Sequence, residues 1–251
     1  MSIDYEIRGT KLVEIPYLDE GLVNQSITDD VLIVGERIAT EGILQTVLDR
    51  DFKKCVCTDI MPMGKNSTLE KIIDKDSRVS FIQKDFIEFD EDLKYDYIIC
   101  INVLEHFGMN FSDFSGFSGA LAGDDYVRWN HDLRALKKMI LLLKNKPTSK
   151  IIITVPAGAP VLSGDTTFGQ ADSNLMPKLR RYDNFRIDMI KKMIDEDDII
   201  NNFEDKYYYS ENFVEWFESD ATILNPEYLR LQNSYSPNMI WAFTLTIGEN
   251  K

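Results

Sequence analysis

The sequence predicts an α/β fold in which a doubly wound, mostly parallel sheet is covered by helices on both faces. Short runs of Val and Ile recur along the chain, and they are apolar throughout rather than alternating with polar residues. A strand with this pattern is covered on both sides, which is typical of parallel sheets. The stretches between the runs are long enough for right-handed crossover helices. The runs that we expect as strands are 31–34, 55–57, 79–82, 97–101 and 151–155.

Two amphipathic helices are expected among the connections. The clearer one covers 124–143, where apolar residues recur every three or four positions and form one stripe. Lysines gather towards its C-terminal half, where positive charge is favourable for the helix dipole. A second helix is expected over 184–194. The residues of the apolar stripe are Trp129, Leu133, Leu136, Ile140 and Leu143.

The last third of the chain adds two strands, 203–209 and 239–247, which brings the predicted sheet to seven. In the second of these, apolar and small or polar residues alternate, as in a half-exposed or edge strand, and a final antiparallel strand would explain this pattern. We see no repeat or linker, so we expect one domain over 1–251, with 1–29 as an N-terminal cap segment. The irregular insertions 107–125 and 157–183 are long enough to cap an active site, because long loops without regular structure are often lids.

The charge balance limits the class of partner. The chain has 42 acidic and 28 basic residues, a formal net charge of −14. Nucleic-acid binding requires a basic surface, and attachment to anionic membranes does too. No apolar run approaches the ~20 residues needed to cross a bilayer, and the N-terminus lacks the pattern of a secretory signal. We therefore expect a cytoplasmic protein, a monomer or homodimer, with a small molecule as its partner.

The cysteines and histidines argue against a metal site. The cysteines lie inside apolar runs and are expected as reduced core residues. With two histidines in the chain, a Cys/His zinc site has too few ligands at usable spacing. Asp124, Asp125 and His106 could together hold Mg²⁺, but no spacing requires it. We predict no metal.

Polar residues and glycine follow the first two strands. Ligands of open parallel sheets bind beyond the carboxyl ends of the strands. Gly35 suits a tight turn and the close approach of a ligand, or a simple strand-to-helix turn. Arg37 stands where the second glycine of a dinucleotide fingerprint would be. Asp59 can accept hydrogen bonds from both ribose hydroxyls, or it can serve as a turn or cap residue, and Ile60 would then lie against an adenine.

The third and fourth strands end in similar positions. Asp85 could accept from an adenine amino group with Phe86 beside the ring, although Asp is common after strands. The segment 102–107, Asn-Val-Leu-Glu-His-Phe, gathers polar residues where a parallel sheet opens its cleft. This is the most informative segment of the chain.

Taken together, these segments resemble class I S-adenosylmethionine-dependent methyltransferases over roughly residues 30 to 156. The resemblance implies a Rossmann-like fold with a terminal antiparallel strand, S-adenosyl-L-methionine as the cofactor, and methyl transfer to oxygen or nitrogen. The family usually has an acidic residue and a second glycine around the first strand's end, where this chain has Ile33 and Arg37. The segments that carry the resemblance are VLIVG, CTDIMP, FIQKDFIEFD, YDYIICINVLEHFG, DLRALKKMILLLK and KIIITVP.

The resemblance also implies cofactor contacts. Gly35 and the backbone of Glu36 would approach the methionine part, and Asp59 would bind the ribose with Ile60 on the adenine. Arg37 is a hypothetical partner of the methionine carboxylate. The remaining contacts would be Asp85 and Phe86 at the adenine end, and Ile101 and Asn102 at the methionine amino group or sulfonium.

Acceptor and catalytic residues are expected around the insertions. His106 is the first candidate for a base, or it packs in the first turn of a helix. Glu105 would orient His106, bind on the cofactor side or cap a helix. His131 would line the cleft or be an exposed helical residue. Arg181 and Tyr182 would contact the acceptor, with Arg181 suited to phosphate, or form a solvated loop pair.

A looser resemblance concerns the acceptor. The segment after LEHFG, the VPAGAP turn and RRYDNFRI are similar to methyltransferases of bacterial capsular and other surface-polysaccharide pathways. The acceptors that this implies are sugar hydroxyls, amino sugars, nucleotide-sugars, and phosphate or phosphoramidate groups. Two alternatives remain open. An NAD(P)-dependent oxidoreductase would also suit Gly35 and Asp59, and the missing motif glycine would suit a non-catalytic binding subunit of the same fold.

Overall fold

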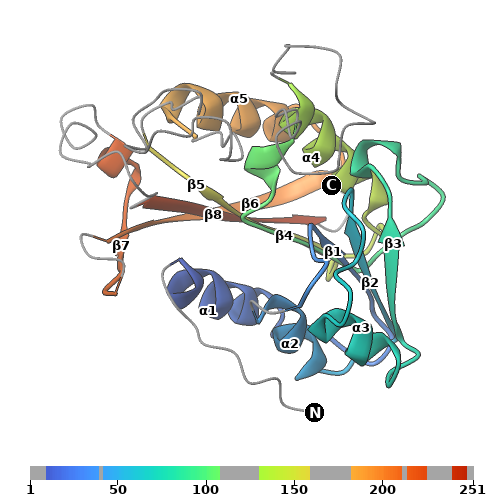
Figure 1. Ribbon diagram of the computed structural model, residues 1–251. Coiled ribbons are helices and arrows are strands. Elements are labelled where there is room, and N and C mark those ends of the chain that lie inside the picture. The colour runs from blue at the N-terminus through green and yellow to red at the C-terminus, as the bar shows by residue number, and fades with distance from the viewer. Residues whose placement is uncertain are drawn as a thin grey trace, which may run out of the picture.

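A computed structural model describes residues 10–39, 42–107, 130–158, 182–210, 214–224 and 239–247. In this part of the chain, eight strands form one sheet in the order β3-β2-β1-β4-β5-β8-β6-β7 (Figure 1). The strands are β1 (Asp30–Val34), β2 (Lys54–Asp59), β3 (Val79–Gln83), β4 (Tyr97–Ile101), β5 (Lys150–Pro156), β6 (Ile200–Tyr209), β7 (Phe217–Ser219) and β8 (Met239–Ile247).

Helices cover both faces of the sheet, as predicted for a doubly wound fold. Figure 1 shows α1, α2 and α3 on one face and α4 and α5 on the other. Among the described residues, three short 3₁₀ turns follow strands or connect them. The helical elements are α1 (Lys11–Gly21), α2 (Ile43–Leu48), α3 (Thr68–Ile73), α4 (His131–Leu142), α5 (Asn184–Asp195), η1 (Phe86–Glu88), η2 (Leu104–His106) and η4 (Ala221–Leu224).

The sheet is parallel from β3 to β5 and antiparallel beyond it. β8 pairs antiparallel with both β5 and β6, which confirms the predicted antiparallel C-terminal strand. The prediction of a half-exposed or edge strand was wrong, because β8 lies between two strands and most of its residues are buried. The described residues give eight strands where seven were predicted. The additional strand, β7, has three residues that pair with the end of β6, and all three are exposed. A strand that short and exposed has no apolar pattern to recognise.

Two cores explain why the parallel strands are apolar throughout. Along β1, Leu32 and Val34 pack in the core under α4 and α5, while Val31 and Ile33 pack in the core under α1, α2 and α3. Successive side chains of a strand point to opposite faces, so both sets are needed when both faces are covered. The cysteines are buried with free thiols, as predicted.

The helix predicted over 124–143 is α4 from residue 131, and residues 124–129 lie outside the described part. The helix predicted over 184–194 is α5.

α1 was not predicted as a helix. It lies in the predicted cap segment, and its Tyr17 hydroxyl lies 3.0 Å from Thr244 Oγ1 on β8. Residues 108–129 and 159–181 are outside the described part, and these two ranges include most of both predicted insertions. Within the described part, no helix has the length and apolarity to cross a bilayer.

Candidate functional site

The first turn at the carboxyl edge of the sheet depends on Gly35. Its φ of +83° lies in the left-handed region, and its N–H donates to the carbonyl of Thr58 at 2.7 Å. A Cβ at this position would lie 2.3 Å from Val103 Cγ2. The glycine is therefore the predicted tight turn. The close approach that it permits in this structure is made by Val103, from the loop after β4.

Glu36 closes the same turn with its side chain. The residue is buried, and its Oε1 accepts from the N–H of Ala39 at 2.7 Å. Ala39 has a φ of +56°, so this bond supports an unfavourable backbone conformation. Arg37 is half-buried, and its carbonyl accepts from Gly64 N–H at 3.2 Å. Sequence reasoning assigned Glu36 only a backbone role. The sequence signal for the side-chain role was the position of Glu36 in a loop, three residues before the small residue Ala39.

Asp59 ends β2 beside this turn. Because Val34 pairs with Thr58, Gly35 and Asp59 lie at the same level of adjacent strands. Oδ1 of Asp59 accepts from the N–H of Met61 at 2.8 Å, which confirms the turn role. Burial raises the pKa of Asp59, while the bond from Met61 and the charge of Arg37 lower it in part. The ribose contact, with Ile60 beside it, stays a prediction.

The end of β3 carries the predicted adenine contacts. Oδ1 of Asp85 accepts from Ile87 N–H at 3.0 Å and caps η1. Phe86 is buried, and its ring packs against Phe89 and Phe107 with centroids 5.8 and 6.0 Å apart. In the structure, these two residues therefore serve the fold. Their contact with a cofactor remains a prediction.

The end of β4 holds an unusual backbone conformation. Ile101 is buried, and Asn102 has a φ of +55°, in the left-handed region. The N–H of Asn102 donates to the carbonyl of Thr154 on β5 at 2.9 Å. Conformations of this kind in residues other than glycine cost energy and cluster at functional sites. This position fits the predicted place of Asn102 beside the methionine part of the cofactor.

Glu105 and His106, the predicted catalytic pair, both lie in η2. Glu105 is fully buried, and in the described part of the chain neither of its carboxyl oxygens accepts a hydrogen bond from another residue. His106 Nε2 is 3.9 Å from Glu105 Oε1, too far for a hydrogen bond. Burial raises the pKa of Glu105, and Glu14 adds to this while Lys11 opposes it. Burial lowers the pKa of His106 to about 4.

Glu14 is a buried acid near Glu105 that the sequence analysis did not single out. It belongs to α1, it is fully buried, and its Oε1 accepts from Thr154 Oγ1 at 3.1 Å. Its Oε2 accepts from Thr10 Oγ1 at 3.2 Å and lies 2.9 Å from Lys11 Nζ. The available signal was an acid directly between Val13 and Ile15, two core residues. An acid on the apolar side of a helix indicates a buried polar contact.

Two of the three predicted acceptor residues, His131 and Tyr182, lie at or beside the start of α4. His131 begins α4, and its Nε2 lies 3.0 Å from Arg134 Nη1. Tyr182 is fully buried, and its hydroxyl donates to Asp132 Oδ2 at 3.1 Å. Tyr182 is therefore a core residue in the structure, and its contact with an acceptor stays a prediction. Arg181 lies outside the described residues.

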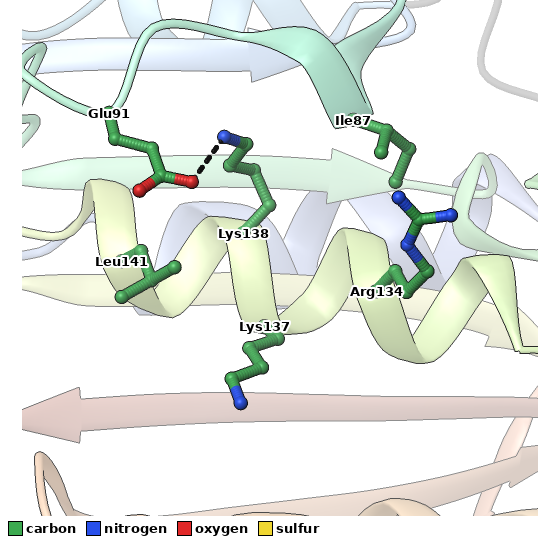
Figure 2. A pocket seen from close by; sticks show the side chains of 6 residues that line it. All are labelled: Ile87, Glu91, Arg134, Lys137, Lys138 and Leu141. Carbon is green, nitrogen blue, oxygen red and sulfur yellow. Dashed lines mark hydrogen bonds and ion pairs between the residues drawn. The ribbon is translucent and has the colours of Figure 1, made fainter.

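A hollow of about 180 Å³ lies on the outer flank of α4, and none of the residues that line it is a predicted site residue. Figure 2 shows Lys138 pointing towards Glu91, to which it is joined at 2.7 Å, and Lys137 pointing away from it. Three basic side chains here make a local exception to the acidic surface. No group of three possible metal ligands occurs among the residues that the structure describes. The lining residues are Ile87, Glu91, Arg134, Lys137, Lys138 and Leu141.

Several solved structures with a similar fold are methyltransferases. Haemonchus contortus phosphoethanolamine N-methyltransferase 2, in complex with phosphomonomethylethanolamine and S-adenosylhomocysteine, matches with a TM-score of 0.59 and 15% identity. The match covers 98% of this chain and 55% of that one, so this chain spans about half its length. The chain has the class I S-adenosylmethionine-dependent methyltransferase fold.

Two further matches to this methyltransferase fold cover most of both chains. The Bradyrhizobium japonicum N-methyltransferase NodS, in complex with S-adenosyl-L-homocysteine, has a TM-score of 0.51 and 11% identity over 93% of this chain and 85% of that one. A putative methyltransferase of Haloferax volcanii, solved with the activator Trm112, has a TM-score of 0.52 and 12% identity. The match covers 95% of this chain and 92% of that one. No family model and no curated protein matches the sequence.

Proposed function

We propose that this protein is a methyltransferase that transfers the methyl group of S-adenosyl-L-methionine to an oxygen or nitrogen of a small polar acceptor. The observation that carries the proposal is the pairing of β1 with β2 inside the methyltransferase fold. This register sets the Gly35 turn and the Asp59 carboxylate side by side at the carboxyl edge. Ligands of open parallel sheets bind at that edge.

The cofactor roles follow the order of the strands. In this proposal, Asp59 binds the ribose hydroxyls, and Ile60, Asp85 and Phe86 serve the adenine. The turn after β1 and the end of β4 hold the methionine part. The charge that Arg37 places near Asp59 also supports a partner role for Arg37 at the methionine carboxylate. The residues that would hold the methionine part are Gly35, Glu36, Arg37, Ile101 and Asn102.

Catalysis would rest mainly on position and exclusion of water. S-adenosyl-L-methionine would supply a methyl group activated by its sulfonium charge, and an acceptor lone pair held in line with the C–S bond would displace the neutral thioether. Holding the acceptor in line and removing water supplies much of the rate. Burial lowers the pKa of His106 to about 4, so the imidazole is neutral at pH 7 and can accept a hydrogen bond. His106 would thus orient the acceptor through this hydrogen bond. It would not hold the proton that the acceptor releases.

The acceptor class is proposed from sequence segments alone. The similarity of RRYDNFRI and its neighbouring segments to surface-polysaccharide methyltransferases supports a sugar, nucleotide-sugar or phosphorus-bearing acceptor in the cytoplasm. Arg181 would hold a phosphate, because its planar guanidinium can donate two parallel hydrogen bonds. His131 and Tyr182 are the further proposed acceptor contacts.

Calorimetry with S-adenosylmethionine, S-adenosylhomocysteine and NAD tests the proposal. We expect both sulfur compounds to bind and NAD not to bind. The change Asp59→Ala should weaken their binding by about 1–3 kcal/mol, the scale of losing hydrogen bonds to a charged group. The matched control is Asp198→Ala, which removes an exposed carboxylate and should leave binding unchanged. Binding of NAD alone would favour an oxidoreductase, and a folded protein that binds none of the three would favour a non-catalytic subunit.

A further inference from the structure

Two fully buried carboxylates lie near the carboxyl ends of β4 and β5. Glu105 belongs to η2, which follows β4. Glu14 belongs to α1 and is fixed to β5 by the hydroxyl of Thr154 at 3.1 Å. Thr154 pairs with Ile101, the last residue of β4. Two acids from distant parts of the sequence therefore meet at the carboxyl edge of the sheet.

The two acids differ in their partners. Glu14 accepts hydrogen bonds from the hydroxyls of Thr10 and Thr154, and its carboxylate forms an ion pair with Lys11 at 2.9 Å. In the described part of the chain, Glu105 accepts no hydrogen bond from another residue, although Glu14 and Lys11 face it from α1 and Cys100 faces it from β4. His106, on its own turn, stays at 3.9 Å. A buried carboxyl without donors is costly, and a ligand that supplied donors would relieve this cost.

We propose that Glu105, backed by Glu14, binds a protonated amino group of the acceptor, so that the acceptor is an amine and the methylated atom is nitrogen. This inference rests on the proposed methyltransferase function and narrows it. An ammonium group has three N–H donors and a positive charge, which match a carboxylate with two unfilled oxygens and a second acid behind it. An alcohol brings one donor and no charge, and it would leave the buried negative charge uncompensated.

The position of the pair favours the acceptor over the nucleoside. Asp59, the proposed ribose contact, is on β2, whereas Thr154 is on β5, three strand spacings away in the order β2-β1-β4-β5. At about 4.8 Å per spacing, the two positions are roughly 14 Å apart. The cofactor's methyl group would lie between them. Glu105, which follows β4, would then lie on the side of the methyl group away from Asp59.

The proposed step balances in atoms and charge. The bound ammonium gives one proton to the Glu105 carboxylate and becomes a neutral amine with a free lone pair. The lone pair forms the new C–N bond as the C–S bond breaks, and the sulfonium becomes a neutral thioether. Burial raises the pKa of Glu105, which makes its carboxylate a better proton acceptor. The methylated ammonium leaves, and Glu105 loses its proton to water.

A titration with methylammonium chloride tests the site without knowledge of the acceptor. The probe is added to protein carrying ¹³C in its glutamate carboxyl groups, with potassium chloride at equal ionic strength as the reference. The Glu105 signal is assigned by its absence in Glu105→Gln. We expect this signal to move saturably with methylammonium and not with potassium. We also expect Glu14→Gln to weaken methylammonium binding, measured by this signal, at least tenfold. The control Glu91→Gln changes an exposed residue on the flank of α4 and should leave the binding unchanged. No saturable movement, or equal movement with potassium, overturns the proposal.

Cofactor binding separates this proposal from the proposed function. Glu105→Gln should bind S-adenosylhomocysteine and 5′-methylthioadenosine within twofold of the original protein. If Glu105→Gln binds S-adenosylhomocysteine tenfold more weakly but binds 5′-methylthioadenosine unchanged, Glu105 holds the cofactor's own ammonium group. That result overturns the proposal. If the original protein binds neither compound, the methyltransferase function fails. The methylammonium titration on cofactor-free protein still decides whether Glu105 binds an ammonium group.

Discussion

At the scale of single residues, Gly35 and Val103 share one small space at the end of β1. The change Gly35→Ala places a Cβ 2.3 Å from Val103 Cγ2 and strains a backbone whose φ is +83°. Overpacking and left-handed strain together should lower the free energy of unfolding by about 2–4 kcal/mol in urea titrations. Adding Val103→Ala should recover the packing part and leave the strain. Unchanged stability of Gly35→Ala would contradict this packing.

His106 makes the stability depend on pH on the acid side. Its pKa is about 4 in the folded protein, against 6.5 in the unfolded chain. Between these values the unfolded chain binds the proton and the folded protein does not, so stability falls as pH drops from 6.5 towards 4. The original protein should lose up to about 3 kcal/mol relative to His106→Gln over this range. His131→Gln is the matched control, and urea titrations that show parallel losses for all three proteins would disprove the effect.

Glu105 should give the opposite dependence. Burial raises its pKa in the folded protein, so the unfolded chain ionises first and stability falls as pH rises above about 4.5. The change Glu105→Gln removes this cost while preserving the shape of the side chain. Its stability advantage over the original protein should therefore grow with pH, as thermal unfolding at pH 4.5 and above would measure. An advantage that shrinks with pH would contradict the buried, unpartnered state of Glu105.

At the scale of elements, a buried ion pair joins α4 to α5. Arg186 Nε donates to Asp132 Oδ2 at 3.0 Å, and the Tyr182 hydroxyl reaches the same oxygen. The change Asp132→Ala leaves the buried Arg186 charge without this partner and should cost about 3–5 kcal/mol. The double variant Asp132→Leu/Arg186→Met removes both charges and should cost less than the single change. Chemical unfolding measures both, and equal losses would show that the pair is not coupled.

The strands were predicted well because their pattern follows from burial on two faces. The runs at 31–34 and 97–101 lie within β1 and β4, since a parallel strand needs apolar residues on both sides. α1 was missed because it carries Pro16 and the buried Glu14, which interrupt an apolar stripe. β7 was missed because its residues are exposed. The pattern of apolar residues predicts elements that bury one face or both faces. It fails for elements that bury few residues, such as β7, or that bury polar residues, such as α1.

At the scale of the whole molecule, the edge of the sheet was predictable and its internal contacts were not. Gly35, Asp59, Asp85 and Asn102 all lie at strand ends, because a parallel sheet brings its carboxyl ends to one edge. The partner of each side chain depends on elements far away in sequence. Glu14 reaches this edge only because α1 packs against β5, a contact that no local pattern encodes.

The measurement that bears most directly on the account is a crystal structure of the protein with S-adenosylhomocysteine. We expect the nucleoside to cross the ends of β1 and β2, with its ribose hydroxyls about 2.6–3.2 Å from the Asp59 carboxylate. The amino-acid end should reach the loop after β4. A nucleoside bound anywhere else, or an Asp59 carboxylate that contacts Met61 N–H and no part of the ligand, would contradict the account.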